Sequence, residues 1–499
     1  MKFKVPSIIF FVLAMCVLAK PVFAEEPKMV FAAYLQGAPV YGTTIESYKK
    51  EIRDAQALGI DGFVYYILSA NIGSDPRIFT AADESGFKMI LAITDCCDFI
   101  DPVSSPPLVV NLIKTTTKHP SYYKYNNSPV VLTWRGEDRE PQFWPEGIIA
   151  PLKKEGIDIL LMPFFSIQKK DVDIAQWAWP NWFKNYAGGF NFVSASRLPQ
   201  DTIKYGEQQT DYMKTINKFY MAGVSPYYFR TRHSSATRDY VEYDGGEEIA
   251  KQWESIINVQ KPKWVNIVTW NDYTESYINP VDTKRTDIFL TNPGFGNNTR
   301  PLLKPHNGYA QLMKYYITWY KTGSQPPITS DSLFYFYRTH PKNLVASDEP
   351  NDIRTHGTSG TSTNDDGSHN NILDVIYITT ILTKPARLTV VSGGSSSTKN
   401  IETGIQHSRI PLKPGRQLFQ LYRNNNLIFE KEGEEILSQI KLYNFILTTG
   451  YVYSNNQTIP GDFNGDGNVD GADFTKIKAE FGHPYTIFDY NLLVGNWGK

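Results

Sequence analysis

The stretch VNIVTWNDYTES, residues Val265–Ser276, decides the fold that the rest of the chain predicts. Its first half is an apolar run, typical of a strand that is buried on both faces of a parallel sheet. Two carboxylates follow three residues apart, Asp272 and Glu275. Parallel α/β folds place their chemistry just beyond the carboxyl ends of their strands. A carboxylate pair there suits glycosidic bond cleavage, in which one acid protonates the leaving oxygen and one base activates water; an ordinary turn is the alternative.

Seven other apolar runs precede this one. They are Met29–Tyr34, Asp61–Ile67, Met89–Asp95, Val130–Trp134, Ile157–Phe164, Phe190–Val193 and Phe219–Val224. Helical spacing of apolar residues lies between and after the runs, as in Ile45–Ala55, Glu247–Ile257 and Tyr309–Tyr320. Eight strands that alternate with helices predict a (β/α)8 TIM-like barrel over residues 27–325. Because the sixth strand is short, a count of seven stays open.

Several strands end in polar or aromatic side chains. Asp95 ends its strand and Glu137 follows the next one, whereas Asp61 begins its strand, where an acid usually serves a turn. Aromatic faces stack on sugar rings, and packing in the core is the alternative role for such residues. The aromatic candidates for a sugar cleft lie at strand exits or in the loops that follow: Tyr34, Tyr66, Trp134 and Trp179.

The amino terminus predicts export. A basic start, Met1–Lys4, and the apolar run Ile8–Ala19 are typical of a signal peptide over residues 1–24, and the run is too short to cross a membrane. The remaining cysteines, Cys96 and Cys97, are adjacent, which excludes a disulfide framework. Lys plus Arg (50) balances Asp plus Glu (51), so nucleic-acid binding is not expected. The barrel segment has no His or Cys cluster with metal spacing, and we expect catalysis without a cofactor.

The spacing of apolar residues changes after the proline-containing linker Gly323–Pro327. Period-two runs with regular turns predict a β-sandwich accessory domain over residues 330–455. These runs include Ser332–Tyr337, Asp374–Leu382, Ala386–Val391 and Gln417–Tyr422. The domain binds glycan or braces the barrel, and the lack of a clear row of exposed aromatics favours bracing.

The tail contains a calcium-loop pattern. Oxygen ligands stand at positions 1, 3, 5, 9 and 12, a backbone carbonyl at position 7, and Gly467 at position 6 allows the sharp turn. The six ligand residues are Asp462, Asn464, Asp466, Asn468, Asp470 and Asp473. Asp at position 12 and the lack of a long preceding helix match a dockerin repeat, so residues 457–499 are predicted to be a dockerin-like module with one structural Ca²⁺. A second segment, Phe488–Gly498, echoes Ala472–Gly482 without a calcium loop of its own.

These motifs together resemble glycoside hydrolase family 71, the α-1,3-glucanases or mutanases. The resemblance lies in FAAYLQG (Phe31–Gly37), ALGIDGFVYYI (Ala57–Ile67), LTWRGED (Leu132–Asp138), WAWPNW (Trp177–Trp182), YMAGVSPYYF (Tyr220–Phe229), WNDYTES (Trp270–Ser276) and YYITWYKTGSQPPI (Tyr315–Ile328). It implies a TIM-like barrel, an α-glucan substrate and inversion at the anomeric carbon. The acids that it implies as catalytic are Asp272, Glu275 and, in the GIDGF phrase, Asp61. Trp270, Asn271 and Tyr273 in the same phrase become candidate substrate-binding residues.

Alternative functions stay open at this point. The first prediction is a secreted hydrolase of α-1,3-glucan, with Glu275 as acid and Asp272 as base, or the reverse. A hydrolase of another α-linked glycan is the second, and a non-catalytic glycan-binding protein of the cell surface is the third. The dockerin-like tail predicts attachment to a cohesin-bearing scaffold, and its missing second calcium loop weakens that expectation.

Overall fold

A computed structural model describes most of the chain. The described residues are 27–67, 74–94, 106–134, 142–164, 186–192, 199–231, 238–242, 244–273, 276–280, 303–304, 306–347, 373–441, 444, 446–454, 461, 463, 469–479, 481 and 486–497.

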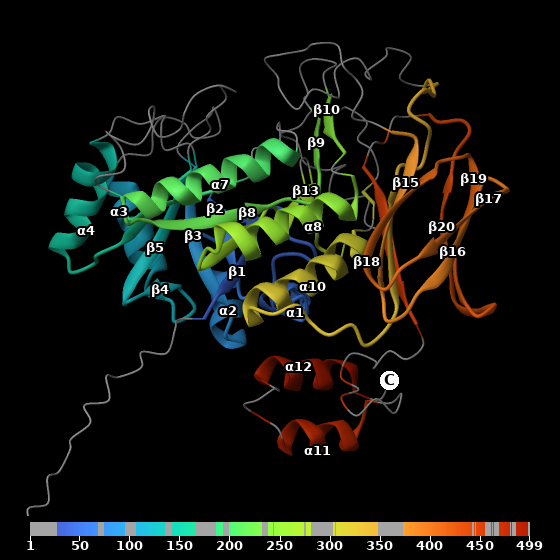
Figure 1. Cartoon of the computed structure of the whole chain (residues 1–499). Coiled ribbons are helices and arrows are strands. Elements are labelled where there is room, and N and C mark those ends of the chain that lie inside the picture. Colours follow the sequence, from blue (N-terminus) through green and yellow to red (C-terminus); the bar gives the residue numbers. More distant parts are fainter. Residues whose placement is uncertain are drawn as a thin grey trace, which may run out of the picture.

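A curled sheet of parallel strands forms the first part of the molecule (Figure 1). Its strands are β1 (Met29–Leu35), β2 (Gly62–Ile67), β3 (Lys88–Thr94), β5 (Ser128–Trp134), β6 (Leu160–Pro163), β7 (Gly188–Phe190), β8 (Phe219–Val224) and β11 (Trp264–Ile267). They pair in the order β6-β5-β3-β2-β1-β11-β8-β7, and the short strand β4 (Lys124–Tyr125) pairs antiparallel with β5. Each of the eight predicted strands is therefore present.

The two edges of this sheet, β6 and β7, approach each other. The backbone N–H of Ala187, just before β7, donates to the carbonyl of Leu161 in β6 at 2.9 Å. No ladder pairs β6 with β7 in the described residues. The fold is thus a mixed α/β fold with a curled sheet, and the described residues do not show the continuous ladder of a complete TIM barrel.

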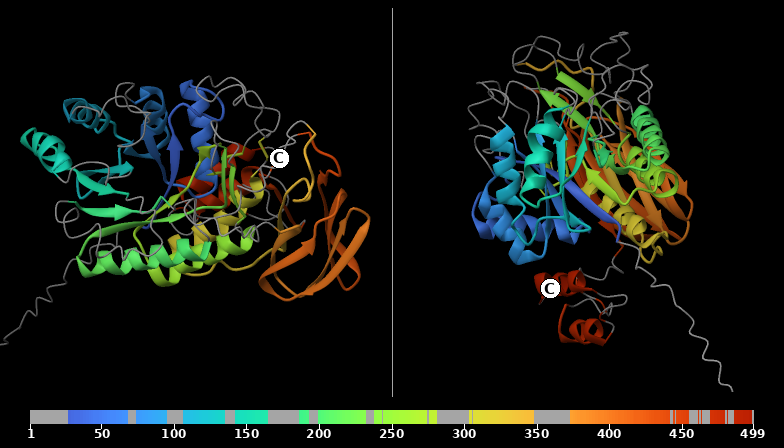
Figure 2. Two further views of the ribbon diagram at one scale, coloured as in Figure 1. Left: turned by 90° about the horizontal axis from the view of Figure 1, so that it is seen from above. Right: turned by 90° about the vertical axis from the view of Figure 1, so that its left-hand side faces the viewer.

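Helices follow the strands and cover the outer side of the sheet (Figure 2). They are α1 (Ile45–Ala57), α2 (Pro76–Ser85), α3 (Pro106–Thr116), the turn η2 (Pro145–Ile149) with α4 (Ala150–Lys154), α7 (Pro199–Thr215), α8 (Gly246–Ser255) with η4 (Ile256–Gln260), and α10 (Asn307–Thr322). Local chemistry sets the ends of some of them. The side chain of Thr44 caps α1 by accepting from Ser47 N, and Asp75 caps α2, where Pro76 is the first helical residue.

Alternate residues of each strand face two different cores. In β1, Val30 and Ala32 pack outward against the helices, whereas Phe31 and Ala33 pack inside the curl of the sheet. Both sets are fully buried, as expected for a parallel sheet that is covered on both faces.

Two antiparallel sheets follow and pack face to face. One sheet contains β18 (Gly404–Pro411), β15 (Val375–Leu382), β14 (Ser332–Tyr337) and β21 (Thr448–Tyr453) in that order. The other contains β17 (Ser395–Ile401), β16 (Ala386–Ser392), β19 (Gly415–Arg423) and β20 (Asn426–Ile436). Leu388 and Phe419 lie in the buried cluster that the two sheets share. The predicted β-sandwich-like arrangement is therefore present.

The sandwich also packs against α8 and α10, at the right of Figure 1. Glycines make this approach close: a Cβ on Gly308 would lie 2.9 Å from backbone atoms of Gly450, and one on Gly246 would lie 2.4 Å from Thr379 Oγ1. Phe336 of β14 belongs to the same buried cluster as the outer face of the curled sheet. The boundary predicted near residue 325 therefore separates two parts that share one core.

The tail contains α11 (Gly471–Ala479) and α12 (Ile487–Asn496), which lie below α1 and α10 in Figure 1. Val469, Ile477 and Leu493 form its small core. In the described part of the chain, no helix has the length and apolar character needed to cross a membrane.

Candidate active site

Asp272 lies beyond the carboxyl end of β11, as the sequence predicts. It belongs to β12 (Asn271–Asp272), which pairs antiparallel with β13 (Ser276–Tyr277) in a small hairpin. Its backbone N–H donates to Thr269 Oγ1 at 2.7 Å, and the Thr269 hydroxyl donates across the hairpin to the carbonyl of Ser276. Asp272 is 8% exposed, and the pKa of the neighbouring Tyr227 is raised chiefly by burial, with Asp272 adding a smaller effect in the same direction. A carboxylate is thus held at the edge where parallel sheets do their chemistry.

Asn271 fixes this hairpin to the β1–α1 loop, residues 36–44. Its Oδ1 accepts from Leu35 N at 2.7 Å, and its Nδ2 donates to the carbonyls of Leu35 (3.1 Å) and Ala38 (2.8 Å). The side chain is fully buried, so it is a structural clamp in this structure. The predicted contact of Asn271 with substrate does not fit this burial.

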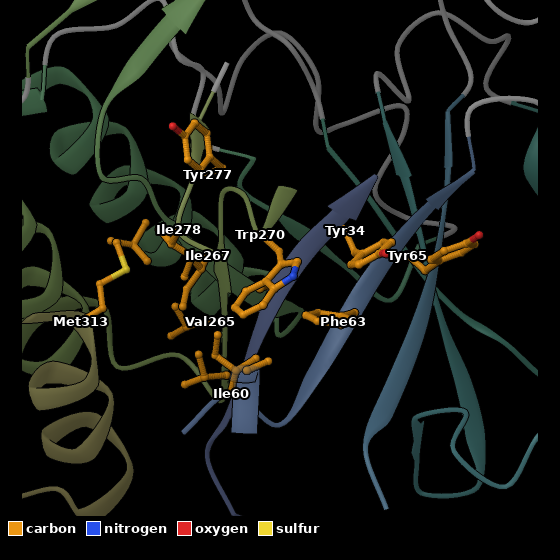
Figure 3. Close-up of a cluster of buried hydrophobic side chains, with 14 of the residues drawn as sticks. Tyr34, Ile60, Phe63, Tyr65, Val265, Ile267, Trp270, Tyr277, Ile278 and Met313 are labelled. Carbon is orange, nitrogen blue, oxygen red and sulfur yellow. The ribbon is translucent and has the colours of Figure 1, made fainter. Parts of the chain in front are cut away.

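Trp270 points away from the carboxyl edge, toward the helix layer. Figure 3 shows its ring beside Phe63 and near Tyr34, and the ring centroids of Trp270 and Phe63 are 5.5 Å apart. Its indole N–H donates to Glu51 Oε1 at 2.8 Å, and its backbone N–H donates to the carbonyl of Ala33 at 2.7 Å. The ring is fully buried on the side of the sheet that faces α1, so Trp270 anchors the hairpin there and cannot stack on a sugar.

Glu51, a fully buried acid on α1, is not among the residues that the sequence predicts for the site. Burial raises the pKa of its carboxyl to about 8, against the opposing effect of hydrogen bonds from Trp270, Val40 and Tyr34. A signal was present in the sequence. Glu51 stands three residues after Tyr48 and four before Ala55, on the apolar stripe of the helix.

His306 was missed as well, and it holds β13 from the other side. Its Nδ1 lies 2.7 Å from the carbonyl of Tyr277 and its Nε2 lies 3.1 Å from the carbonyl of Leu447, just before β21. Its ring stacks on Tyr277 with centroids 4.0 Å apart. Burial lowers the pKa of His306 to about 4, so the neutral ring carries one N–H and donates to one of these two carbonyls. The hairpin is therefore tied to the sandwich.

Tyr273, between the two carboxylates of the motif, is 4% exposed. Its hydroxyl oxygen accepts from Asn279 Nδ2 at 3.1 Å, and its ring meets that of Tyr277 at 5.3 Å. It braces the hairpin in this structure.

An aromatic cluster lines the inner side of the sheet at the same edge. Trp134, at the end of β5, contacts Phe164 (centroids 4.9 Å apart) and Phe192 (4.3 Å), and Phe192 contacts Tyr66 at 5.3 Å. Trp134 is only partly buried. Trp134 is the last residue of β5, and its contact with a sugar stays a prediction. Phe164 and Phe192 each lie just past the end of a strand, which is the signal by which they could have been found.

Tyr34 does not lie in the cleft. Tyr34 lies on the face of β1 that packs against the helices, as Val30 and Ala32 do. It is 1% exposed and stacks on Tyr65, with ring centroids 5.8 Å apart. Its hydroxyl donates to Glu51 Oε2 at 3.3 Å. The prediction that Tyr34 binds substrate is wrong because its ring is enclosed between the sheet and α1.

Asp61 lies at the opposite edge of the sheet. Its Oδ2 accepts from Val30 N at 2.8 Å, and its Oδ1 pairs with Lys321 Nζ at 2.6 Å. The six residues of β2 separate it from the carboxyl edge by roughly 20 Å at 3.3 Å per residue. The family-based assignment of Asp61 to the catalytic group does not fit this position, because its carboxylate joins β1, β2 and α10 at their base.

Several predicted residues lie outside the described residues. They are Glu275, Asp95, Glu137, Trp179, Asp462, Asn464, Asp466 and Asn468. Of the predicted calcium ligands, Asp470 and Asp473 are described. Asp473 is fully buried, and its Oδ2 accepts from Asp470 N at 2.9 Å. No group of three or more His, Cys, Asp or Glu side chains suited to a metal occurs among the residues that the structure covers.

A carboxylate on a hairpin at the carboxyl edge of the sheet is the arrangement expected of a glycoside hydrolase. The model of glycosyl hydrolase family 71 matches residues 26–460, so the chain belongs to this family. A mutanase of Penicillium rubens is 26% identical over 440 residues, which cover 85% of this chain and 89% of that protein. A glucan endo-1,3-alpha-glucosidase of Schizosaccharomyces pombe is 26% identical over 456 residues, which cover 85% and 95%. A solved GH99 endo-alpha-mannosidase from Bacteroides thetaiotaomicron has 16% identity and a TM-score of 0.45, and the match covers 59% of this chain and 98% of that one.

Proposed function

We propose that this protein hydrolyses α-1,3-glucan. The observation that carries the proposal is the place of Asp272, in the WNDYTES phrase, on a hairpin at the carboxyl edge of the sheet. Family membership and the activities named for the two fungal relatives support the choice of substrate. We take the curled sheet as a (β/α)8 barrel, which the backbone bond between Ala187 and Leu161 supports.

The two carboxyl groups of the motif divide the reaction between them. Glu275 gives its proton to the glycosidic oxygen, the bond from that oxygen to the anomeric carbon breaks, and the leaving sugar departs as an alcohol. Asp272 takes a proton from a water that attacks the anomeric carbon from the opposite face, so the configuration inverts. The reverse assignment of acid and base uses the same atoms. Inverting enzymes hold the two carboxyl groups about 6.5–9.5 Å apart to make room for this water.

Trp134 supplies an aromatic face at the mouth, and Trp179, Asp95 and Glu137 are proposed to bind the glucan from neighbouring strand ends. Hydroxyl groups of a sugar suit carboxylate acceptors, and its C–H faces suit aromatic rings. No cofactor is needed for this chemistry.

The test compares single variants on insoluble α-1,3-glucan by release of reducing sugar. Asp272→Asn and Glu275→Gln are each expected to lower kcat by about 10²–10⁴-fold or more, because each removes a proton-transfer group. Asp211→Asn, an exposed acid on α7, is the matched control and keeps full activity. Normal activity in either site variant would refute the assignment.

Starch, dextran and mannan serve as parallel substrates, and cleavage of one of these in place of α-1,3-glucan would move the protein to another α-linked glycan. NMR of fresh product decides the stereochemistry. Inversion gives the β-anomer first, and an initial α-anomer contradicts it.

We further propose that the chain is secreted through its amino-terminal signal and that its tail binds one structural Ca²⁺. The donor set is all oxygen, which is the chemistry that Ca²⁺ prefers, and the carboxylate of Asp473 is already buried at the start of α11. The ligands would be Asp462, Asn464, Asp466, Asp470 and Asp473, with the backbone carbonyl of Asn468. Chelator is expected to lower the melting temperature of the tail and leave glucan hydrolysis unchanged, and loss of hydrolysis would contradict this.

Attachment through a cohesin is the finer proposal for the tail. Phe481 and Trp497 are each 55% exposed, whereas Ile477 is buried inside the module. A pull-down with the full chain and with a form that ends at Asn456 tests it. Equal recovery of partners by both forms, with calcium and with chelator, would rule out anchoring.

A further inference from the structure

Glu51 is a buried acid that the reaction itself does not use. Its carboxyl receives hydrogen bonds from three parts of the chain: Trp270 Nε1 at 2.8 Å, Val40 N at 3.3 Å and Tyr34 Oη at 3.3 Å. These donors belong to the residue before β12, to the β1–α1 loop and to the end of β1. One side chain therefore joins the catalytic hairpin to the loop beside it. Figure 3 shows the rings of Trp270 and Tyr34, two of these donors, in one buried cluster.

No cation balances Glu51 in the described surroundings. Among the described groups that most affect its pKa, the one charged group is Asp54, one turn further along α1, and Asp54 has the same sign. Burial away from water raises the pKa of this carboxyl, and the nearby negative charge of Asp54 adds to the effect. Both favour the neutral form of Glu51. A neutral carboxyl keeps Oε1 as the acceptor for Trp270 at 2.8 Å, and the Tyr34 hydroxyl donates to Oε2 at 3.3 Å.

A buried acid without a cation costs stability that an apolar side chain would not. Sequences break such local rules mainly where function requires it. Glu51 meets this description, because its partner Trp270 is two residues from Asp272. Asn271, between them, binds the same loop through Leu35 and Ala38.

We propose that Glu51 is a positioning residue for glucan hydrolysis: it holds Trp270 and the β1–α1 loop together and thereby fixes Asp272 at the carboxyl edge. The expected change in kcat rests on the proposed function. The expected loosening of Trp270 and the β1–α1 loop rests on the hydrogen bonds alone.

The test uses the full chain with Glu51→Leu, Glu51→Gln and Trp270→Phe. Glu51→Leu removes every polar contact and is expected to lower kcat by about 10²-fold, the cost of a small misplacement of a reacting group, with little change in KM. Glu51→Gln keeps an amide oxygen that accepts from Trp270, so it restores most of the lost rate. Trp270→Phe, which deletes the N–H donor in a smaller ring, is expected to lower kcat in the same direction.

Glu248→Gln is the matched control, because Glu248 is also a buried helical acid but pairs with Lys251 on α8. It is expected to behave as the unmodified protein. A folded Glu51→Leu variant with unchanged kcat would overturn the proposal. So would a Glu51→Gln variant as slow as Glu51→Leu, because the carboxyl would then act through its charge.

Hydrogen exchange of peptides that cover residues 35–41 and 264–273 separates this inference from the proposed function. Glu51→Leu is expected to speed exchange in these two segments together, whereas Glu51→Gln and Glu248→Gln leave both protected. Faster exchange throughout the protein would instead make Glu51 a general core residue and refute the proposal. If the unmodified protein fails to cleave α-1,3-glucan, the proposed function falls, and the exchange of these two segments still decides the role of Glu51.

Discussion

At the scale of single residues, burial controls what the carboxyl groups of this protein do. Asp272 keeps slight exposure at the carboxyl edge, whereas Glu51 has none. The pKa of Glu51 is raised from 4.5 to about 8, first by desolvation, and Asp54 adds a smaller effect in the same direction. Tyr34, which faces this carboxyl, stays neutral because burial raises its pKa too. The protonation of Glu51 is therefore linked to folding.

The free energy of unfolding should fall with rising pH because of Glu51. Its native carboxyl keeps a proton that the unfolded chain releases above pH 4.5, so its contribution is fully present below pH 4.5 and is lost as pH rises to about 8. At about 1.4 kcal/mol per pKa unit, the loss is on the order of 4 kcal/mol. Glu51→Gln lacks this titration. Urea unfolding at pH 5 and pH 8 measures it: the variant should gain stability relative to the unmodified protein at pH 8, and parallel curves for the two proteins would contradict the prediction.

Asp61 should matter for stability and not for turnover. Asp61→Asn keeps an acceptor for Val30 N but loses the ion pair with Lys321, which is partly buried. A hydrogen bond to a charged group contributes about 1.5–3 kcal/mol, so a loss of this size is expected in chemical denaturation. Because Asp61 lies at the amino-terminal edge, kcat on glucan should stay unchanged. A large drop in kcat with unchanged stability would restore the catalytic role that the family resemblance implies.

The sequence predicted Asp272 because a strand end is visible as the end of an apolar run. It could not assign the faces of β1, since parallel strands buried on both sides are apolar at every position. Tyr34 was therefore placed in the cleft although it faces α1. Glu51 contacts Trp270 across 219 positions and His306 contacts Leu447 across 141, and no local pattern contains these two contacts.

At the scale of elements, the β12–β13 hairpin is too small to hold its own shape, since two strands of two residues give few hydrogen bonds. Its position comes from its neighbours. Asn271 and Trp270 fix one strand to the β1–α1 loop and α1, and His306 fixes the other strand to β21 through Leu447. The geometry of the carboxylates therefore depends on elements from both halves of the chain.

His306→Phe tests the second of these anchors. The variant keeps a ring against Tyr277 but loses both ring nitrogens, so a buried carbonyl is left without its donor, at a cost of about 1–3 kcal/mol. We expect a lower melting temperature together with a lower kcat, because Tyr277 belongs to the catalytic hairpin. His407→Asn, at a histidine of β18 whose Nδ1 lies 3.0 Å from Thr379 Oγ1 and far along the chain from the hairpin, is the control and should leave kcat unchanged. A His306→Phe variant with reduced stability and normal kcat would show that the hairpin does not need this anchor.

At the scale of the whole molecule, the curled sheet and the sandwich behave as one body. Arg338, at the end of β14, is fully buried and donates to Glu242 at 2.5 Å and to Asp374 at 3.0 Å. Glu242 immediately follows β10 (Arg238–Val241), which pairs with β9 (Tyr228–Thr231) in a hairpin beyond the carboxyl end of β8. The sandwich thus supports a second hairpin at the edge that carries the site, and this agrees with a bracing role.

Residues 27–325 alone should therefore fail to form a stable enzyme, whereas residues 27–456 should fold and cleave glucan. Removal of the sandwich would leave the carboxylate of Glu242 buried without Arg338, and breaking a buried pair in this way costs about 3–5 kcal/mol. It would also expose the faces of α8 and α10 that now pack on Phe336, and free His306 from Leu447. These losses together approach the whole stability of an ordinary domain, about 5–15 kcal/mol. Circular dichroism melting and the glucan assay compare the two forms. If the shorter form melts cooperatively near the temperature of the longer one and keeps its kcat, the sandwich is a separate accessory domain and the shared core contributes little.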